Sequence, residues 1–200
     1  MQYFIYGQKE MDYLKKKDKK LGEAMDRIGP IQREVVPDPF SALIFSIVAQ
    51  QISSKAANTV WERLNNLLGS ITPESIGNMA AADIQACGMS MRKAEYIKGI
   101  GEAAVEGVVD FERLSELSDE EIIKQLSALR GVGVWTAEML LIFSLNRPDV
   151  VSYLDLAIRR GMMNLYHKKE LTREQFERYK KRYSPYGSVA SLYLWALSVE

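Results

Sequence analysis

Two glycines and one acid are the residues of this chain whose type and spacing could do chemistry. Gly131 and Gly133 stand one residue apart in the stretch LRGVGVWTAEMLLIFSL, and Asp155 follows shortly after it. Gly131 can adopt the left-handed conformation that ends a helix, and Gly133 leaves the next amides uncovered. Bare N–H groups at the positive end of a helix dipole suit a phosphate oxygen, and carbonyls across the turn could bind a monovalent cation. Taken alone, however, the glycine pair favours an ordinary turn between two helices.

Asp155 opens the segment DLAIRRG at a position where an aspartate would cap the N-terminus of a helix. A cap fixes the direction of its carboxylate. The same group could therefore stabilise a developing positive charge, and it could orient or deprotonate a water molecule. Asp149, in the segment RPDVV, is the second candidate acid, and we rank it lower because it lies in a turn.

The elements that must position these residues are helices. Apolar residues recur with helical spacing over residues 40–48 and 189–197, and capping boxes begin at Ser118 and Thr172. The chain has no Asn-Gly or Asp-Gly hairpin turn and no clean run of alternating residues. We therefore predict an all-α fold. The helix before the glycine turn is expected to end at Leu129 or Arg130, and the next helix to begin at Val134 or Trp135.

Composition limits the class of protein. The chain contains 26 lysine and arginine residues and 26 aspartate and glutamate residues, so its net charge is zero. A neutral chain is not expected to coat nucleic acid by bulk charge, although a local basic face remains possible. The single cysteine, Cys87, excludes an internal disulfide framework and any four-cysteine zinc or iron–sulfur site. The chain shows neither a signal peptide nor an apolar run of membrane-spanning length, so we expect a cytoplasmic protein.

Four segments occur in a fixed order: FSALIFSIVAQQISSKAANTVWERL, GMSMRKAEYI, LRGVGVWTAEMLLIF and DLAIRRG. Together they resemble the helix–hairpin–helix DNA glycosylase superfamily over residues 30–197, and most of all its DNA-3-methyladenine glycosylase II branch. The resemblance is to the compact members, which lack an N-terminal β domain. It implies two helical lobes with the active-site cleft between them. We expect a central bundle over residues 38–148 and a second lobe formed by residues 1–37 with 149–200.

The resemblance also implies roles for individual residues. It places the catalytic aspartate at Asp155, the walls of the base pocket at Trp135, Trp195 and Met139, and the DNA-contacting hairpin at Arg130, Gly131, Val132, Gly133 and Val134. Gln51 matches the side chain that is wedged into the gap left by a flipped base. The main-chain carbonyls of Ser127, Leu129 and Val132 match positions that bind Na⁺ or K⁺.

The implied activity is a monofunctional glycosylase that removes alkylated purines, such as 3-methyladenine, and leaves an abasic site. Trp135 stands where relatives that also cut the backbone carry a lysine. The implied partner is double-stranded DNA with a damaged base, bound by a monomer at the nucleoid without a required cofactor or an iron–sulfur cluster. Tyr153-Leu154 and Met139 depart from the family pattern and leave the substrate range open. The alternatives are a glycosylase for oxidised or deaminated purines and a DNA-binding relative without catalysis.

Other charged segments receive no such role. The run KKKDKK at residues 15–20 and the pair Lys168-Lys169 are interpreted as solvated faces, and Arg92-Lys93 is a weaker candidate for a phosphate contact.

Overall fold

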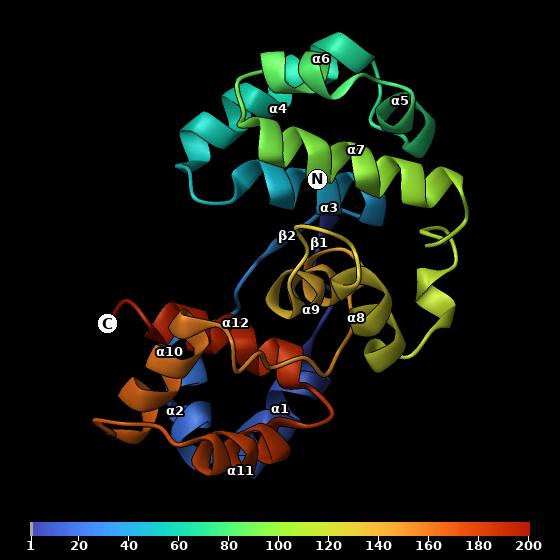
Figure 1. Ribbon diagram of the computed structural model, residues 1–200. Coiled ribbons are helices and arrows are strands. Elements are labelled where there is room, and N and C mark those ends of the chain that lie inside the picture. The colour runs from blue at the N-terminus through green and yellow to red at the C-terminus, as the bar shows by residue number, and fades with distance from the viewer. Residues whose placement is uncertain (1) are drawn as a thin grey trace. The chain divides into compact units, whose positions relative to one another are not determined.

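The computed structural model describes residues 2–200 and confirms the all-α prediction (Figure 1). The helices are α1 (Gln8–Lys17), α2 (Lys19–Ile28), α3 (Pro39–Ala49), α4 (Ser54–Leu68), α5 (Pro73–Gly77), α6 (Ala81–Ala86), α7 (Met91–Val105), α8 (Asp119–Ser127), α9 (Val134–Phe143), α10 (Leu156–Tyr166), α11 (Arg173–Tyr183) and α12 (Gly187–Leu197), with a 3-10 turn η1 (Leu114–Glu116). Two short antiparallel strands, β1 (Gln2–Tyr3) and β2 (Glu34–Val35), pair Gln2 with Val35. They are too short for an alternating pattern to have predicted them.

The described chain forms two compact units. The central unit contains residues 36–140, and the terminal unit contains residues 2–35 together with residues 141–200. The second boundary therefore lies within α9 and not at the turn that follows it. Residues 147–150 are instead hydrogen-bonded to the N-terminal part of α12, and so belong to the terminal unit. No helix among residues 2–200 has the length and apolar character needed to cross a membrane.

The core of the central unit is built on α3 and α7. Phe40, Leu43, Ile44, Ile47 and Val48 of α3 are all buried, as the helical spacing of this segment predicts. Asp38 caps α3 and Pro39 occupies its first turn, so the local sequence sets where this helix begins. Helix α7 packs against α3, α5 and α6, which fixes it in the unit.

The core of the terminal unit is built on α12. Every residue from Gly187 to Leu194 is buried, because α1, α2, α10 and α11 all pack against this helix. The sequence predicts a single apolar stripe, and this prediction is too narrow. Helix α10, which begins directly after Asp155, approaches α12 closely at Gly161, where a Cβ atom would lie 1.9 Å from the carbonyl oxygen of Leu194.

Candidate functional site

The glycine turn joins α8 to α9 in the central unit. Gly131 has a φ of 88°, in the left-handed region that favours glycine, and α9 begins at Val134 as predicted. Helix α8 ends at Ser127, so the prediction of an end at Leu129 or Arg130 is wrong by two or three residues. After Ser127 the backbone changes from α-helical to three-residue turns. The amide of Leu129 donates to the carbonyl of Leu126, and the amide of Val132 donates to the carbonyl of Leu129.

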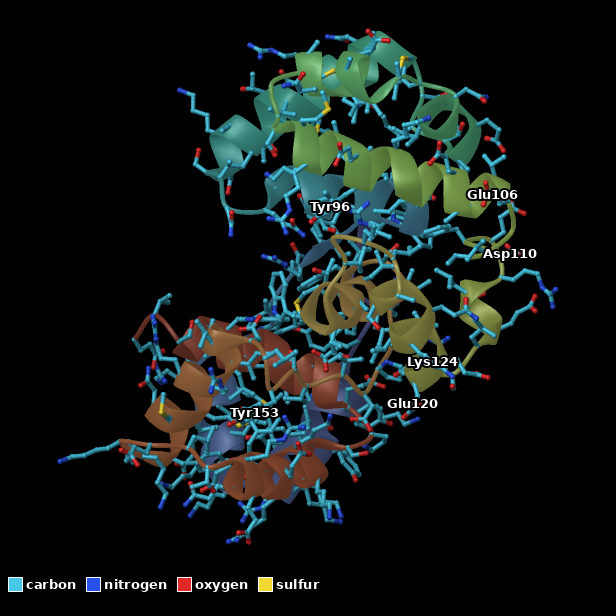
Figure 2. The ribbon with its side chains drawn as sticks, viewed as in Figure 1. Tyr96, Glu106, Asp110, Glu120, Lys124 and Tyr153 are labelled. Atoms are coloured by element: carbon cyan, nitrogen blue, oxygen red, sulfur yellow. The ribbon has the colours of Figure 1, made fainter. Side chains whose placement is uncertain are left out.

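The turn rests on an aromatic ring that the sequence pattern does not reveal. A Cβ atom on Gly131 would lie 2.3 Å from Cδ2 of Tyr96, a residue of α7 labelled in Figure 2. The Tyr96 hydroxyl accepts a 2.5 Å hydrogen bond from Nε of Arg92. The guanidinium groups of Arg92 and Arg130 lie 5.5 and 5.9 Å from the centre of the same ring. Two cations are thereby held beside the hairpin, at cation–π distances.

Gly133 differs from Gly131 in its surroundings. A Cβ atom at Gly133 would meet no atom within 4 Å, and the residue is exposed. The space above this part of the turn is therefore open to a bound group. Of the three carbonyls predicted to bind a monovalent cation, that of Leu129 accepts the amide of Val132 at 3.1 Å and keeps a second lone pair for other partners. Cation binding at Ser127, Leu129 and Val132 stays a prediction.

The loop between α3 and α4 is tied to the hairpin. Nε2 of Gln50 donates a 3.1 Å hydrogen bond to the carbonyl of Gly131. Nζ of Lys93 donates to the carbonyls of Val48 at 2.8 Å and Gln50 at 2.5 Å, and burial lowers the pKa of this lysine. Lys93 therefore stabilises the end of α3 with two of its three donors, and a phosphate contact at Arg92-Lys93 stays a prediction. Gln51, the predicted wedge, is exposed and has a φ of 58°, a strained conformation for a residue with a side chain.

The predicted pocket residues belong to both units. Trp135 is 44% exposed on the first turn of α9, and Met139 is half-buried one turn later on the same face. Both lie in the central unit. Trp195 lies in the terminal unit, where it is half-buried and its ring centre is 5.3 Å from that of Phe143. None of the three side chains is fully buried, so each keeps surface that a ligand could contact.

Asp155 is the N-cap of α10, as predicted. Its Oδ1 atom accepts hydrogen bonds from the amides of Ala157 and Ile158, both at 2.9 Å. The residue is 7% exposed. The carboxylate is therefore held in one direction at the positive end of the helix dipole.

Tyr153, labelled in Figure 2, occupies one of the positions that depart from the family pattern. Its ring lies between two cations, with the guanidinium of Arg173 at 4.2 Å and that of Arg159 at 5.0 Å from the ring centre. The Nε atom of Arg159 is buried and has no hydrogen-bond partner among residues 2–200. Because Arg159 lies one turn after Asp155, this donor is close along the helix to the candidate catalytic acid.

Asp149 has a structural role. Its carboxylate accepts hydrogen bonds from the hydroxyl of Ser184 at 2.5 Å and the amide of Gly187 at 3.0 Å. Ser188 reinforces this link, because its hydroxyl donates to the carbonyl of Arg147 and accepts the amide of Val150. These bonds fasten the segment that leads to Asp155 onto the start of α12. Both carboxylate oxygens of Asp149 therefore hold the segment before Asp155 in place, which favours Asp155 over Asp149 as the catalytic acid.

The comparisons with known proteins agree with this architecture. The family model described as "HhH-GPD superfamily base excision DNA repair protein" matches residues 44–185. DNA-3-methyladenine glycosylase 1 of Schizosaccharomyces pombe is 37% identical over 166 residues, which cover 80% of this chain and 73% of that protein.

Solved structures of such proteins share the fold. A DNA-3-methyladenine glycosidase from Bacillus halodurans superposes with a TM-score of 0.90 at 35% identity, covering 99% of this chain and 93% of the other. A 3-methyladenine DNA glycosylase from S. pombe in complex with abasic DNA superposes with a TM-score of 0.79 at 34% identity, covering 94% and 95%. The match over most of its length and the identity to these relatives place the chain in the HhH-GPD superfamily of base excision DNA repair proteins.

Proposed function

We propose that the protein is a monofunctional DNA glycosylase that hydrolyses the N-glycosidic bond of alkylated purines, such as 3-methyladenine, in double-stranded DNA. The observation that carries the proposal is the carboxylate of Asp155, buried and aimed by two backbone amides, in a chain 37% identical to a DNA-3-methyladenine glycosylase. The protein would act as a monomer on chromosomal DNA.

The reaction begins when the damaged nucleotide leaves the helical stack. A base inside the duplex is out of reach, and flipping it out costs a few kcal/mol. Gln51 is the candidate to fill the vacated space, because its side chain is exposed on a loop whose backbone is fixed by Gln50 and Lys93. The bare amides of the hairpin at Gly133 and Val134 would bind a backbone phosphate near the flipped nucleotide, with Arg92 and Arg130 adding positive charge beside them.

Asp155 would carry the bond-breaking step. An alkylated purine is cationic, so when the bond between the sugar carbon C1′ and the base nitrogen breaks, its electron pair neutralises the ring and the sugar becomes positive. The Asp155 carboxylate stabilises that charge. The oxygen of a water molecule then bonds to C1′ and gives its proton to the carboxylate, which passes it to solvent. The products are the free base and an abasic site.

Recognition of the base would rest on the tryptophans. Indole rings present a negative face, and contact with a cationic base contributes about 0.5–2 kcal/mol depending on desolvation. Trp135 and Trp195 could therefore favour alkylated bases over neutral ones, while Met139 supplies a polarisable side chain at the same wall as Trp135. A sodium or potassium ion bound by the carbonyls of Ser127, Leu129 and Val132 would steady the hairpin backbone.

Position 135 carries tryptophan and not lysine, so we expect the product to be an abasic site in an unbroken DNA strand. With Trp135 in that place, no amine stands there to form a Schiff base, so the abasic site should stay intact until hot alkali cleaves it.

The test is a single-turnover assay of base release on duplexes with methylated purines, hypoxanthine, 8-oxoguanine or no modification. We expect release from methylated DNA and a backbone that breaks only after alkali. Release confined to 8-oxoguanine, or a covalent adduct trapped by borohydride, would refute the proposal.

A further inference from the structure

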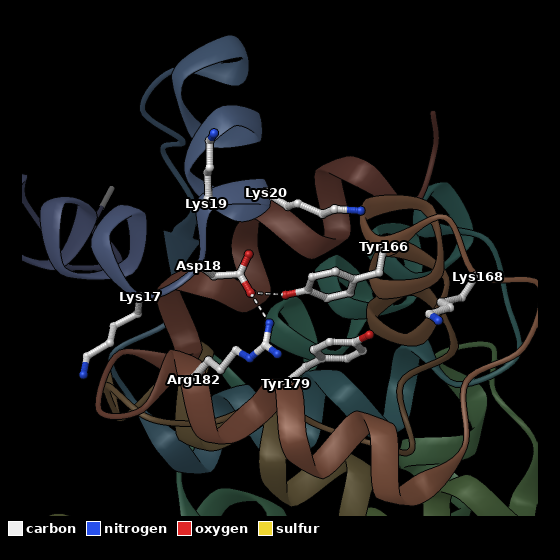
Figure 3. A pocket seen from close by; sticks show the side chains of 8 residues that line it. All are labelled: Lys17, Asp18, Lys19, Lys20, Tyr166, Lys168, Tyr179 and Arg182. Atoms are coloured by element: carbon white, nitrogen blue, oxygen red, sulfur yellow. Dashed lines mark hydrogen bonds and ion pairs between the residues drawn. The ribbon is translucent and has the colours of Figure 1, made fainter.

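Three lysine-rich segments that are far apart in the sequence meet around one pocket of the terminal unit (Figure 3). The segments are residues 15–20, residues 168–169 and residues 180–182. The pocket has a volume of about 410 Å³ and is lined by Lys17, Asp18, Lys19, Lys20, Tyr166, Lys168, Tyr179 and Arg182. In the sequence the lysines at 17, 19, 20 and 168 are typical of solvated faces, whereas in the fold they line a concave surface. None of the lining residues belongs to the proposed catalytic or DNA-contacting set.

The carboxylate of Asp18, the one acid in the pocket lining, is hydrogen-bonded to neighbouring groups of the protein. Asp18 is 4% exposed and caps α2, with Oδ1 accepting the amide of Leu21 at 3.1 Å. Its Oδ2 atom accepts the hydroxyl of Tyr166 at 2.6 Å and Nη1 of Arg182 at 3.1 Å. Burial raises the pKa of Tyr166, so its hydroxyl stays protonated and remains a donor. The charge of Asp18 is thus balanced by Arg182 and does not neutralise the lysines.

The lysines at the rim of the pocket have no close acidic partners. Within residues 2–200, Lys17, Lys20 and Lys168 form no ion pair, and Lys19 reaches Glu23 only at 4.0 Å on the exposed surface, where such a pair contributes little. The chain as a whole is neutral, so this concentration of positive charge is local. Clustered charges on a concave surface with a low-dielectric wall attract oppositely charged ligands.

An aromatic wall completes the pocket. Tyr179 stacks on Tyr166 with ring centres 3.8 Å apart and an interplanar angle of 10°, and the guanidinium of Arg182 lies 5.3 Å from the Tyr179 ring. Tyr166 is held further by a 2.7 Å hydrogen bond between its hydroxyl and that of Tyr183. This wall is rigid, whereas the lysine ammonium groups can move on flexible stems to fit an anion.

We propose that this pocket binds phosphate groups, held by the ammonium groups of Lys20 and Lys168 beside the tyrosine wall, whereas the ammonium of Lys17 lies over the Tyr13 ring and points away from the pocket. Each ammonium offers three donors and a compact charge, which suits the dense negative charge of a phosphoryl group. Two sources offer that chemistry: a small phosphorylated molecule, represented by pyrophosphate, and the backbone of DNA.

The test compares two double variants with the same loss of charge. Lys20→Ala/Lys168→Ala removes two pocket lysines, while Lys16→Ala/Lys169→Ala removes one exposed lysine from each of the same two segments, neither of which lines the pocket. All four side chains are exposed, so both variants should fold, and thermal unfolding checks this. In calorimetric titrations with pyrophosphate at low salt, we expect the pocket variant to bind at least about tenfold more weakly than the wild type and the control.

The DNA arm measures affinity for undamaged duplex as a function of salt. Loss of two phosphate contacts should lower the slope of log K against log[salt] by about 2, in the pocket variant only. A selective effect with pyrophosphate identifies a small phosphorylated ligand, and a selective change of salt slope identifies a DNA strand. Equal behaviour of both variants in both arms would overturn the inference. Base release at saturating methylated DNA should be unchanged, so a failure here is separate from a failure of the proposed function.

Discussion

The side-chain amide of Gln50 donates a 3.1 Å hydrogen bond to the carbonyl oxygen of Gly131, which joins the loop after α3 to the turn before α9. Gln50 is the direct neighbour of Gln51, the candidate wedge, and Gly131 is part of the candidate phosphate-binding hairpin. The two parts of the proposed DNA interface are therefore fixed to each other within the central unit. Lys93 adds a second fastening, because it binds the carbonyl of Gln50 from α7.

The first prediction concerns the strained backbone at Gln51. Its left-handed conformation costs about 1–2 kcal/mol for a residue with a side chain, and glycine avoids that cost but adds about 0.5–1 kcal/mol of unfolded-state entropy. Gln51→Gly should therefore be at least as stable as the wild type, while its single-turnover excision rate falls. Denaturant unfolding and base release measure the two effects. Normal excision by Gln51→Gly would show that Gln51 is not the wedge.

The second prediction separates the two hairpin glycines. Gly131→Ala forces a Cβ atom against the Tyr96 ring from a backbone with a φ of 88°, so it should lower stability by more than about 1 kcal/mol. Gly133→Leu has open space around its Cβ, so it should fold normally but cover the amides that would bind phosphate. Thermal unfolding and DNA titrations at several salt concentrations distinguish the two. Wild-type DNA affinity in Gly133→Leu would argue against the hairpin as an anchor.

A third prediction concerns the segment that leads to Asp155. Ser188 is fully buried, and its hydroxyl bonds both Arg147 and Val150. Ser188→Ala removes the hydroxyl that accepts the buried amide of Val150 and donates to the half-buried carbonyl of Arg147, at a cost of about 1–3 kcal/mol. For a chain of this size, each kcal/mol lowers the melting temperature by about 2–4 °C. The variant should also show a lower single-turnover rate with little change in DNA affinity, and an unchanged rate would mean that this link does not position Asp155.

Local signals in the sequence predict much of this fold. Caps at Ser118, Thr172 and Asp155 mark where helices begin, since a cap acts on amides only two or three residues away. The end of α8 was harder to place, because a switch to three-residue turns leaves no mark on the apolar pattern. Contacts between distant residues could not be predicted at all. Tyr96 under Gly131 is an example, since its burial depends on how α7 packs and not on its neighbours in the sequence.

The candidate site divides in the same way. Asp155 and the hairpin could be found because each is defined by a few consecutive residues, whereas the fastening of Asp149 to Ser184 and Gly187 depends on the packing of α12. The lysine pocket depends likewise on Asp18 meeting Tyr166, 148 residues later. The lysines of this pocket are far apart in the sequence, where each is typical of an exposed surface, and only the packing of the helices brings them together.

The last prediction tests Asp155 itself. Asp155→Asn keeps an oxygen that can accept the amides of Ala157 and Ile158, so α10 should still be capped and the protein should fold and bind a lesion. It removes the charge that stabilises the cationic sugar, and one such group supplies roughly a hundred- to thousandfold in rate, so base release should fall at least that far.

Asp38→Asn is the matched control for Asp155→Asn, because Asp38 caps α3 through the amides of Phe40 and Ser41 and has no place in the proposed chemistry. Asp149 would serve poorly as a control, since it holds the segment that leads to Asp155. Single-turnover base release from methylated duplex, with unfolding curves for both variants, compares the two substitutions. The outcome that would remove Asp155 from its assigned role is equal loss of activity in both variants, because a cap and a catalytic carboxylate would then be indistinguishable.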